Sequence, residues 1–155
     1  MTRVFVLDDQ EFVRSSLKEM LEADGDIRVV GEAGTAEDAR SSIPLTRPEV
    51  AVLDVRLPDG NGVEVCREVR SEHPEIRCVM LSAFDDDEVV DQSILAGASG
   101  FVLKQIKHGH IVDAVRLVAR GELLFGHSQR ARVLERVDDG PDGHARRIGR
   151  LAWPS

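Results

Sequence analysis

Acidic side chains follow two apolar stretches of this sequence, and a hydroxyl and an amine end two others. Asp8 and Asp9 come directly after a valine-rich run, and Asp54 ends a second run. Ser82 and Lys104 end two further runs. An aspartate carboxylate can attack phosphorus and form an aspartyl phosphate, while a lysine and a hydroxyl can contact the transferring oxygens. These five residues are therefore candidates for phosphoryl transfer to a carboxylate.

Three carboxylates can share one cleft only when another charge offsets their repulsion. Two like charges about 4 Å apart cost roughly 4 kcal/mol even at an effective dielectric of about 20. Mg²⁺ prefers oxygen ligands and commonly takes one or two carboxylates together with waters and a phosphate oxygen. We therefore expect Mg²⁺ as the cofactor of a site built from Asp8, Asp9 and Asp54.

Each candidate also has a purely structural interpretation when it is considered alone. Asp8 or Asp9 could cap a following helix, and Asp54 could open a turn. Lys104 could be an ordinary surface lysine, and Ser82 alone carries little information. Their joint occurrence at the ends of four predicted strands favours a common site.

Hydrophobic spacing predicts five strands in alternation with helices. The predicted strands are residues 3–8, 28–33, 50–54, 77–82 and 101–104. A helix is predicted after each strand, the second ending before Pro44 and the fifth covering residues 107–120. Strands separated by single helices favour a parallel sheet with right-handed crossovers. The predicted fold class is α/β, a doubly wound (βα)5 flavodoxin-like three-layer sandwich with sheet order 2-1-3-4-5.

In such a sheet, ligands bind outside the carboxyl ends of the strands. Strands one and three are neighbours in this order, so Asp8, Asp9 and Asp54 are expected to converge. Pro58, Gly60 and Gly62 predict a loop after the third strand, and Asn61 is the expected cap of the next helix.

Composition limits the class of protein. The chain has 155 residues, 42% of them hydrophobic and 31% charged, which suits one globular domain. No apolar stretch is long enough for a membrane span, and the N-terminal run is too short for a signal peptide. A cytoplasmic location is therefore expected. A formal net charge of −8 argues against nucleic-acid binding by this domain itself.

The loop of residues 54–62, DVRLPDGNG, resembles the phosphoacceptor loop of receiver domains from two-component response regulators. The acid pair at positions 8 and 9, the strand end LSA at 81–83 and the segment GFVLK at 100–104 match other motifs of that family. The similarity covers about residues 1–121. It is closest to receivers that precede a LuxR-type helix-turn-helix, such as the dormancy and nitrate regulators.

This resemblance implies a role for each carboxylate. Asp54 is the phosphoacceptor. Asp9, Asp54 and the backbone carbonyl of Arg56 bind Mg²⁺, and Asp8 acts mainly through a metal-bound water.

The resemblance also implies a switch. Lys104 contacts the phosphoryl group and Ser82 hydrogen-bonds it. Phe101 matches the aromatic residue that rotates when that serine moves, although a core phenylalanine is the alternative interpretation. Gln105 stands where the family often has a cis proline, and a non-proline cis bond costs about 2.5–4 kcal/mol, so a trans bond is predicted.

The implied partners are a sensor histidine kinase and, on activation, a second copy of the chain. Phosphorylation would change the surface of the fourth helix, fifth strand and fifth helix and so control dimerisation or an output domain in transcription regulation. Such a protein is not an enzyme beyond intrinsic autophosphorylation and autodephosphorylation. Two alternatives are a receiver-like interaction module without phosphorylation and a flavin carrier, although the acidic loop of residues 8–11 would repel a flavin phosphate.

The region after the receiver is short. Residues 122–137 are expected to form a linker with a short helix at 129–137, and residues 138–155 a flexible tail. Too few residues follow for a complete DNA-binding domain, so we expect either a shortened DNA-binding regulator or a stand-alone receiver.

Overall fold

The computed structural model describes residues 1–84, 86–104, 109–126 and 133. Five parallel strands form the central sheet: β1 (Thr2–Leu7), β2 (Ile27–Ala33), β3 (Val50–Asp54), β6 (Arg77–Ser82) and β7 (Gly100–Leu103). Their order is β2-β1-β3-β6-β7. Counted along the chain this is 2-1-3-4-5, so the predicted doubly wound topology is confirmed.

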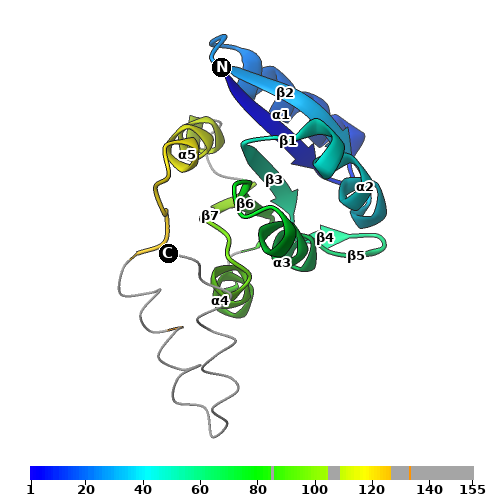
Figure 1. Cartoon of the computed structure of the whole chain (residues 1–155), viewed down its shortest axis with the longest axis vertical. Coiled ribbons are helices and arrows are strands. Elements are labelled where there is room, and N and C mark those ends of the chain that lie inside the picture. The colour runs from blue at the N-terminus through cyan, green and yellow to red at the C-terminus, as the bar shows by residue number, and fades with distance from the viewer. Residues whose placement is uncertain (85, 105–108, 127–132, 134–155) are drawn as a thin grey trace, which may run out of the picture.

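Helices cover both faces of this sheet, which makes three layers (Figure 1). They are α1 (Glu11–Glu22), α2 (Ala36–Thr46), α3 (Gly62–Glu72), α4 (Asp87–Leu95) and α5 (Gly109–Ala119). One apolar core joins the sheet to α1 and α5, and the other joins it to α2, α3 and α4. None of the described helices is both long and apolar enough to cross a membrane.

Alternate residues of the central strands supply the two cores. Val52 of β3 packs in the core of α1 and α5, whereas its neighbour Leu53 packs in the core of α2, α3 and α4. All five residues of β3 are buried, which explains why this run shows no polar face. Fully burying one such side chain is worth about 1.5–3 kcal/mol, so the carboxyl end of β3 is firmly held.

The end predicted for the second helix is wrong. Helix α2 continues through Pro44 and ends at Thr46. Proline removes one intrahelical hydrogen bond, the one to the carbonyl of Arg40, and that residue is exposed to water. Arg47 closes the helix with a φ of 48°, and its N–H donates to the carbonyl of Ile43 at 3.0 Å. A proline in the last turn is therefore tolerated.

The loop predicted after β3 contains a small hairpin. Strands β4 (Arg56–Leu57) and β5 (Gly60–Asn61) pair antiparallel. The Asn61 side chain then accepts a hydrogen bond from Val63 N at 2.6 Å, which confirms the predicted cap of α3. Other boundaries differ from the predictions by one or two residues, as helix and strand ends commonly do.

The predicted linker helix, the tail and Gln105 lie outside the described residues, apart from Val133. Val133 is 2% exposed and packs in the core shared by α2, α3 and α4.

Gly62 allows α3 to start against the end of β3. A Cβ atom at this position would lie 1.9 Å from the carbonyl oxygen of Asp54. The Gly62 N–H donates to the carbonyl of Val55 at 2.8 Å, so the helix start cannot move away freely.

We predict that Gly62→Ala lowers the free energy of unfolding by about 1–3 kcal/mol, because the backbone must shift to relieve the overlap. Urea unfolding measures this change. Gly126→Ala is the matched control, since among the described residues a Cβ there meets nothing within 4 Å, and it should alter stability by less than about 0.5 kcal/mol. Equal effects of the two changes would contradict the packing explanation.

Candidate functional site

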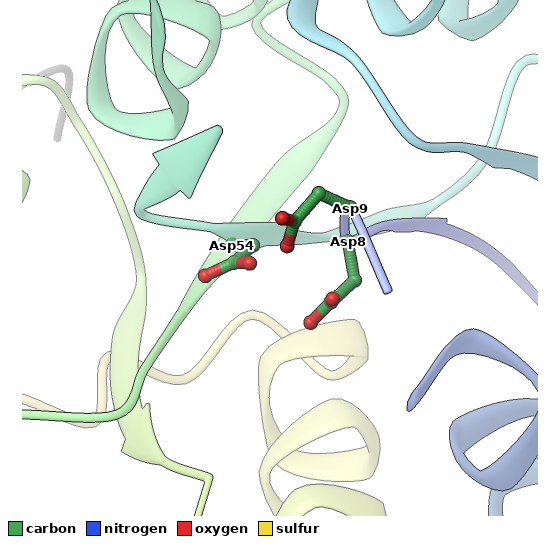
Figure 2. Close-up of side chains that lie close together, drawn as sticks. All are labelled: Asp8, Asp9 and Asp54. Carbon is green, nitrogen blue, oxygen red and sulfur yellow. The ribbon is translucent and has the colours of Figure 1, made fainter. Parts of the chain in front are cut away.

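Three carboxylates meet where neighbouring strands end. Leu7 of β1 pairs with Leu53 of β3, so Asp8 and Asp54 leave the sheet side by side. One oxygen from each of Asp8, Asp9 and Asp54 lies within 4.8 Å of the others. Figure 2 shows the three side chains projecting toward one another. Asp8 is fully buried and Asp54 is 3% exposed, whereas Asp9 is exposed.

Lys104 directly follows β7, the strand beyond β6, and its side chain extends to this acidic group. Its Nζ lies 2.8 Å from Asp8 Oδ2 and 3.0 Å from Asp54 Oδ2. The backbone holds the residue in place, because Lys104 N donates to the carbonyl of Ser82 at 2.8 Å. One ammonium thus faces three carboxylates, and an excess of negative charge remains.

Burial and these charges shift the proton affinity of the site. Burial raises the pKa of Asp54 from 3.8 to about 6, and the charge of Asp8 adds to the rise, while the hydrogen bond from Lys104 opposes it. Burial lowers the pKa of Lys104, but its bonds to Asp8 and Asp54 outweigh that effect and leave the pKa raised. Lys104 therefore stays protonated, and Asp54 titrates close to neutral pH.

The oxygen atoms suit a hard divalent cation. Asp8 Oδ1 accepts a hydrogen bond from Gln10 N at 2.9 Å, which fixes the carboxylate. Asp8 Oδ2 is buried, and in the described part of the chain it accepts no well-directed hydrogen bond, although the Lys104 ammonium is close. Carboxylate oxygens that are held close together in this way fit the oxygen ligands that Mg²⁺ requires.

The Ser82 hydroxyl hydrogen-bonds to the backbone of its own loop. Its Oγ donates to the Phe84 carbonyl at 3.0 Å and accepts from Phe84 N at 3.1 Å. Arg56, two residues after Asp54, is exposed, and its guanidinium carbon lies 4.7 Å from the centroid of the Phe84 ring. The loops after β3 and β6 therefore touch beside the acidic group.

Phe101 is half-buried on β7 and packs against the core of α2, α3 and α4. It also lines a cavity of about 440 Å³ together with Val90 and Leu124. The residue thus has both a core contact and adjacent free space.

Asp59 ties the hairpin after β3 to the start of α2, a contact that the sequence did not predict. From the turn between β4 and β5, its carboxylate accepts hydrogen bonds from Ala36 N at 2.8 Å and Glu37 N at 3.0 Å. These bonds cap α2 and lower the pKa of Asp59. The Asp59-Gly60 pair signalled only a turn, since nothing local indicates a partner 23 residues earlier.

Comparison with known proteins identifies the family. Residues 4–116 match the response regulator receiver domain. The chain belongs to this family. The receiver is 45% identical over 137 residues to the DNA-binding transcriptional activator DevR/DosR of Mycobacterium tuberculosis, covering 88% of this chain and 63% of that protein. It is 32% identical over 123 residues to the response regulator VraR of Staphylococcus aureus, covering 79% of this chain and 59% of VraR. The receiver thus spans about three fifths of these relatives.

Solved structures agree with this assignment. A LuxR-family two-component response regulator from Aurantimonas superposes with a TM-score of 0.78 at 25% identity, covering 88% of this chain and 97% of that one. The NarL signal receiver domain from Mycobacterium tuberculosis has a TM-score of 0.75 at 37% identity, covering 78% and 98%. The resemblance to receivers of LuxR-type regulators is confirmed.

The raised pKa of Asp54 predicts a pH-dependent stability of the metal-free receiver. A proton remains on folded Asp54 between its ordinary pKa of 3.8 and about 6, whereas the unfolded chain has lost it. This proton contributes fully to the free energy of unfolding below the ordinary pKa of 3.8. The contribution is lost as the pH rises through the folded-state pKa of about 6.

We therefore expect the Asp54 carboxyl carbon to titrate near pH 6 in a carbon-detected NMR experiment without metal. Asp54→Asn should remove the loss of stability over that interval. Asp59, whose pKa is lowered, is the internal control and should titrate below an ordinary aspartate. An Asp54 titration near that of an ordinary aspartate would contradict the assigned cause.

Proposed function

We propose that this receiver is a phosphoacceptor switch of a two-component system, in which Asp54 takes a phosphoryl group from a histidine kinase. The observation that carries this proposal is the buried Asp54 carboxylate, which lies close to two further acids and to the ammonium of Lys104. Membership of the receiver family supports the same role. The transcriptional names of the relatives support a downstream role in transcription regulation.

Asp9, Asp54 and the backbone carbonyl of Arg56 would hold Mg²⁺, and Asp8 would act through a metal-bound water. When bound, this ion supplies positive charge that offsets the repulsion between the carboxylates and an incoming phosphoryl group. The buried carboxylate of Asp8, which lies beside those of Asp9 and Asp54, supports this assignment.

Asp54 acts as the nucleophile in its ionised form. A carboxylate oxygen bonds to phosphorus as the bond from phosphorus to the donor histidine nitrogen breaks, and the imidazole leaves. With a pKa of about 6, Asp54 is mostly ionised at neutral pH. Lys104 exchanges its contact with Asp54 for one with a phosphoryl oxygen.

The added phosphoryl group carries about −1.5 to −2 charges and three acceptor oxygens. Ser82 would turn from the Phe84 backbone to donate to one of these oxygens. Phe101 would then move inward, with space supplied by the cavity beside Leu124. The surface of α4, β7 and α5 would change and favour a homodimer or control of an output domain. We expect this to occur in the cytoplasm, without nucleic-acid contact by the receiver itself.

Asp54→Asn should abolish labelling by acetyl phosphate in the presence of Mg²⁺, because an amide cannot form the acyl phosphate. Intact-mass spectrometry detects the phosphoryl adduct. Asp59→Asn is the control and should still be labelled, since Asp59 lies in the α2 cap. Undiminished labelling of Asp54→Asn would refute the role of this residue.

Lys104→Met should bind Mg²⁺ about tenfold more tightly, because an ammonium close to the metal ligands repels the ion. It should also accept phosphate more slowly, since one charge that stabilises the transferring oxygens is lost. Calorimetric titration at pH 8 and acetyl phosphate labelling measure the two effects. Exposed Lys18 on α1 supplies the control Lys18→Met, which should change neither. Weaker Mg²⁺ binding by Lys104→Met would contradict the electrostatic account.

A further inference from the structure

Arg14 sends its side chain from the first turn of α1 toward the end of β1. The side chain is only 20% exposed. Its Nη1 donates a hydrogen bond of 2.6 Å to the backbone carbonyl of Asp8. The Arg14 side chain therefore binds the backbone between the two adjacent acids and does not extend into water.

The guanidinium lies in a narrow slot between Glu32 and Gly34. Its Nε lies 3.6 Å from Glu32 Oε1 on β2, so a carboxylate balances the charge of Arg14. Beyond β2, a Cβ atom on Gly34 would lie 3.0 Å from Arg14 Nη1. Any larger residue at position 34 would therefore crowd the guanidinium, and the missing side chain leaves room for it.

The bond from Arg14 completes the restraint on Asp8. On one side, Asp8 N donates to the carbonyl of Ala33 at 3.1 Å, and the Asp8 side chain is held by Gln10 N. On the other side, Arg14 holds the carbonyl of the peptide that joins Asp8 to Asp9. The orientation of that peptide determines where the Asp9 side chain begins.

The position of the Asp9 carboxylate depends on this peptide more than that of the Asp8 carboxylate does. Asp9 is exposed, and within the described residues its carboxylate has no hydrogen bond or ion pair. Only the main chain directs it toward Asp8 and Asp54 (Figure 2).

We propose that Arg14 is a positioning residue, which orients the peptide between Asp8 and Asp9 and thereby sets the Mg²⁺ affinity of the site. This inference rests on the proposed function. Arg14 would act through the two acids, by its bond to the carbonyl of Asp8, and not by contact with the phosphoryl group or the metal. Glu32 and Gly34 keep the guanidinium in place.

An electrostatic role and a positioning role of Arg14 predict opposite changes in Mg²⁺ affinity when Arg14 is removed. Removing a positive charge near a cation site should strengthen Mg²⁺ binding if only electrostatics mattered. Releasing the peptide should weaken binding, because residues that orient metal ligands commonly contribute about 10–100-fold to metal affinity. The direction of the change therefore separates the two explanations.

The test is calorimetric titration of the full chain with MgCl₂ at pH 8. Arg14→Met, which keeps much of the apolar stem, should bind Mg²⁺ at least about tenfold more weakly. Gly34→Ala changes no charge but narrows the slot, and it should also weaken binding. Arg40→Met is the matched control, because it breaks the Arg40–Glu68 ion pair between α2 and α3, away from the acids, and it should bind as the wild type does.

Urea unfolding without metal checks that the variants remain folded and compares their stabilities. Arg14→Met that binds Mg²⁺ as tightly as the wild type, or more tightly, overturns the positioning role. Weakened binding by Arg40→Met as well would also overturn it, because the effect would then follow from lost stability. A wild-type chain that binds no Mg²⁺ would instead refute the proposed function together with this inference.

Discussion

Repulsion among carboxylates at one edge of the sheet is the constraint on which the rest of the site depends. The order of the strands makes β1 and β3 neighbours, so the acids that end them cannot avoid each other. Lys104 offsets part of this repulsion through two short contacts. The remaining negative charge costs folding free energy, and it also creates affinity for a divalent cation. Stability and binding are therefore coupled in the same group of atoms, and metal binding should stabilise the fold by mass action.

The same repulsion gives Asp54 its chemical character. Burial and the neighbouring Asp8 raise its pKa to about 6, and Lys104 limits that rise. A carboxylate that is reluctant to carry charge gains most when a cation neutralises that charge. Lys104 has contacts with both acids, and in the proposed function it releases one when the phosphoryl group arrives. One added group would therefore change several electrostatic contacts together, as the proposed switch requires.

Much of this arrangement could be predicted from the sequence, because the chemical residues lie at the ends of strands. The apolar run ending at Asp54 and the acids after the first strand are local patterns, and strand alternation with helices specifies how such ends come together. The wrong end of α2 came from applying a local rule to Pro44, whose lost hydrogen-bond acceptor is in an exposed residue. The hairpin of β4 and β5 was missed because two-residue strands have too little periodicity to be recognised.

The contacts that side chains make with the main chain near the site could not be predicted, and the reason is physical. Asp59 and Arg14 bind backbone N–H and carbonyl groups, and Gly62 makes room for one. Every residue other than proline offers the same backbone groups, so no pattern of side chains marks the partner. A contact between two side chains requires complementary residue types at both positions. A contact with the main chain requires a particular residue type at only one of the two positions. In the proposed account, the positions of the acids depend largely on contacts with the main chain. The sequence therefore indicates the chemistry of the site but not the contacts that hold it in place.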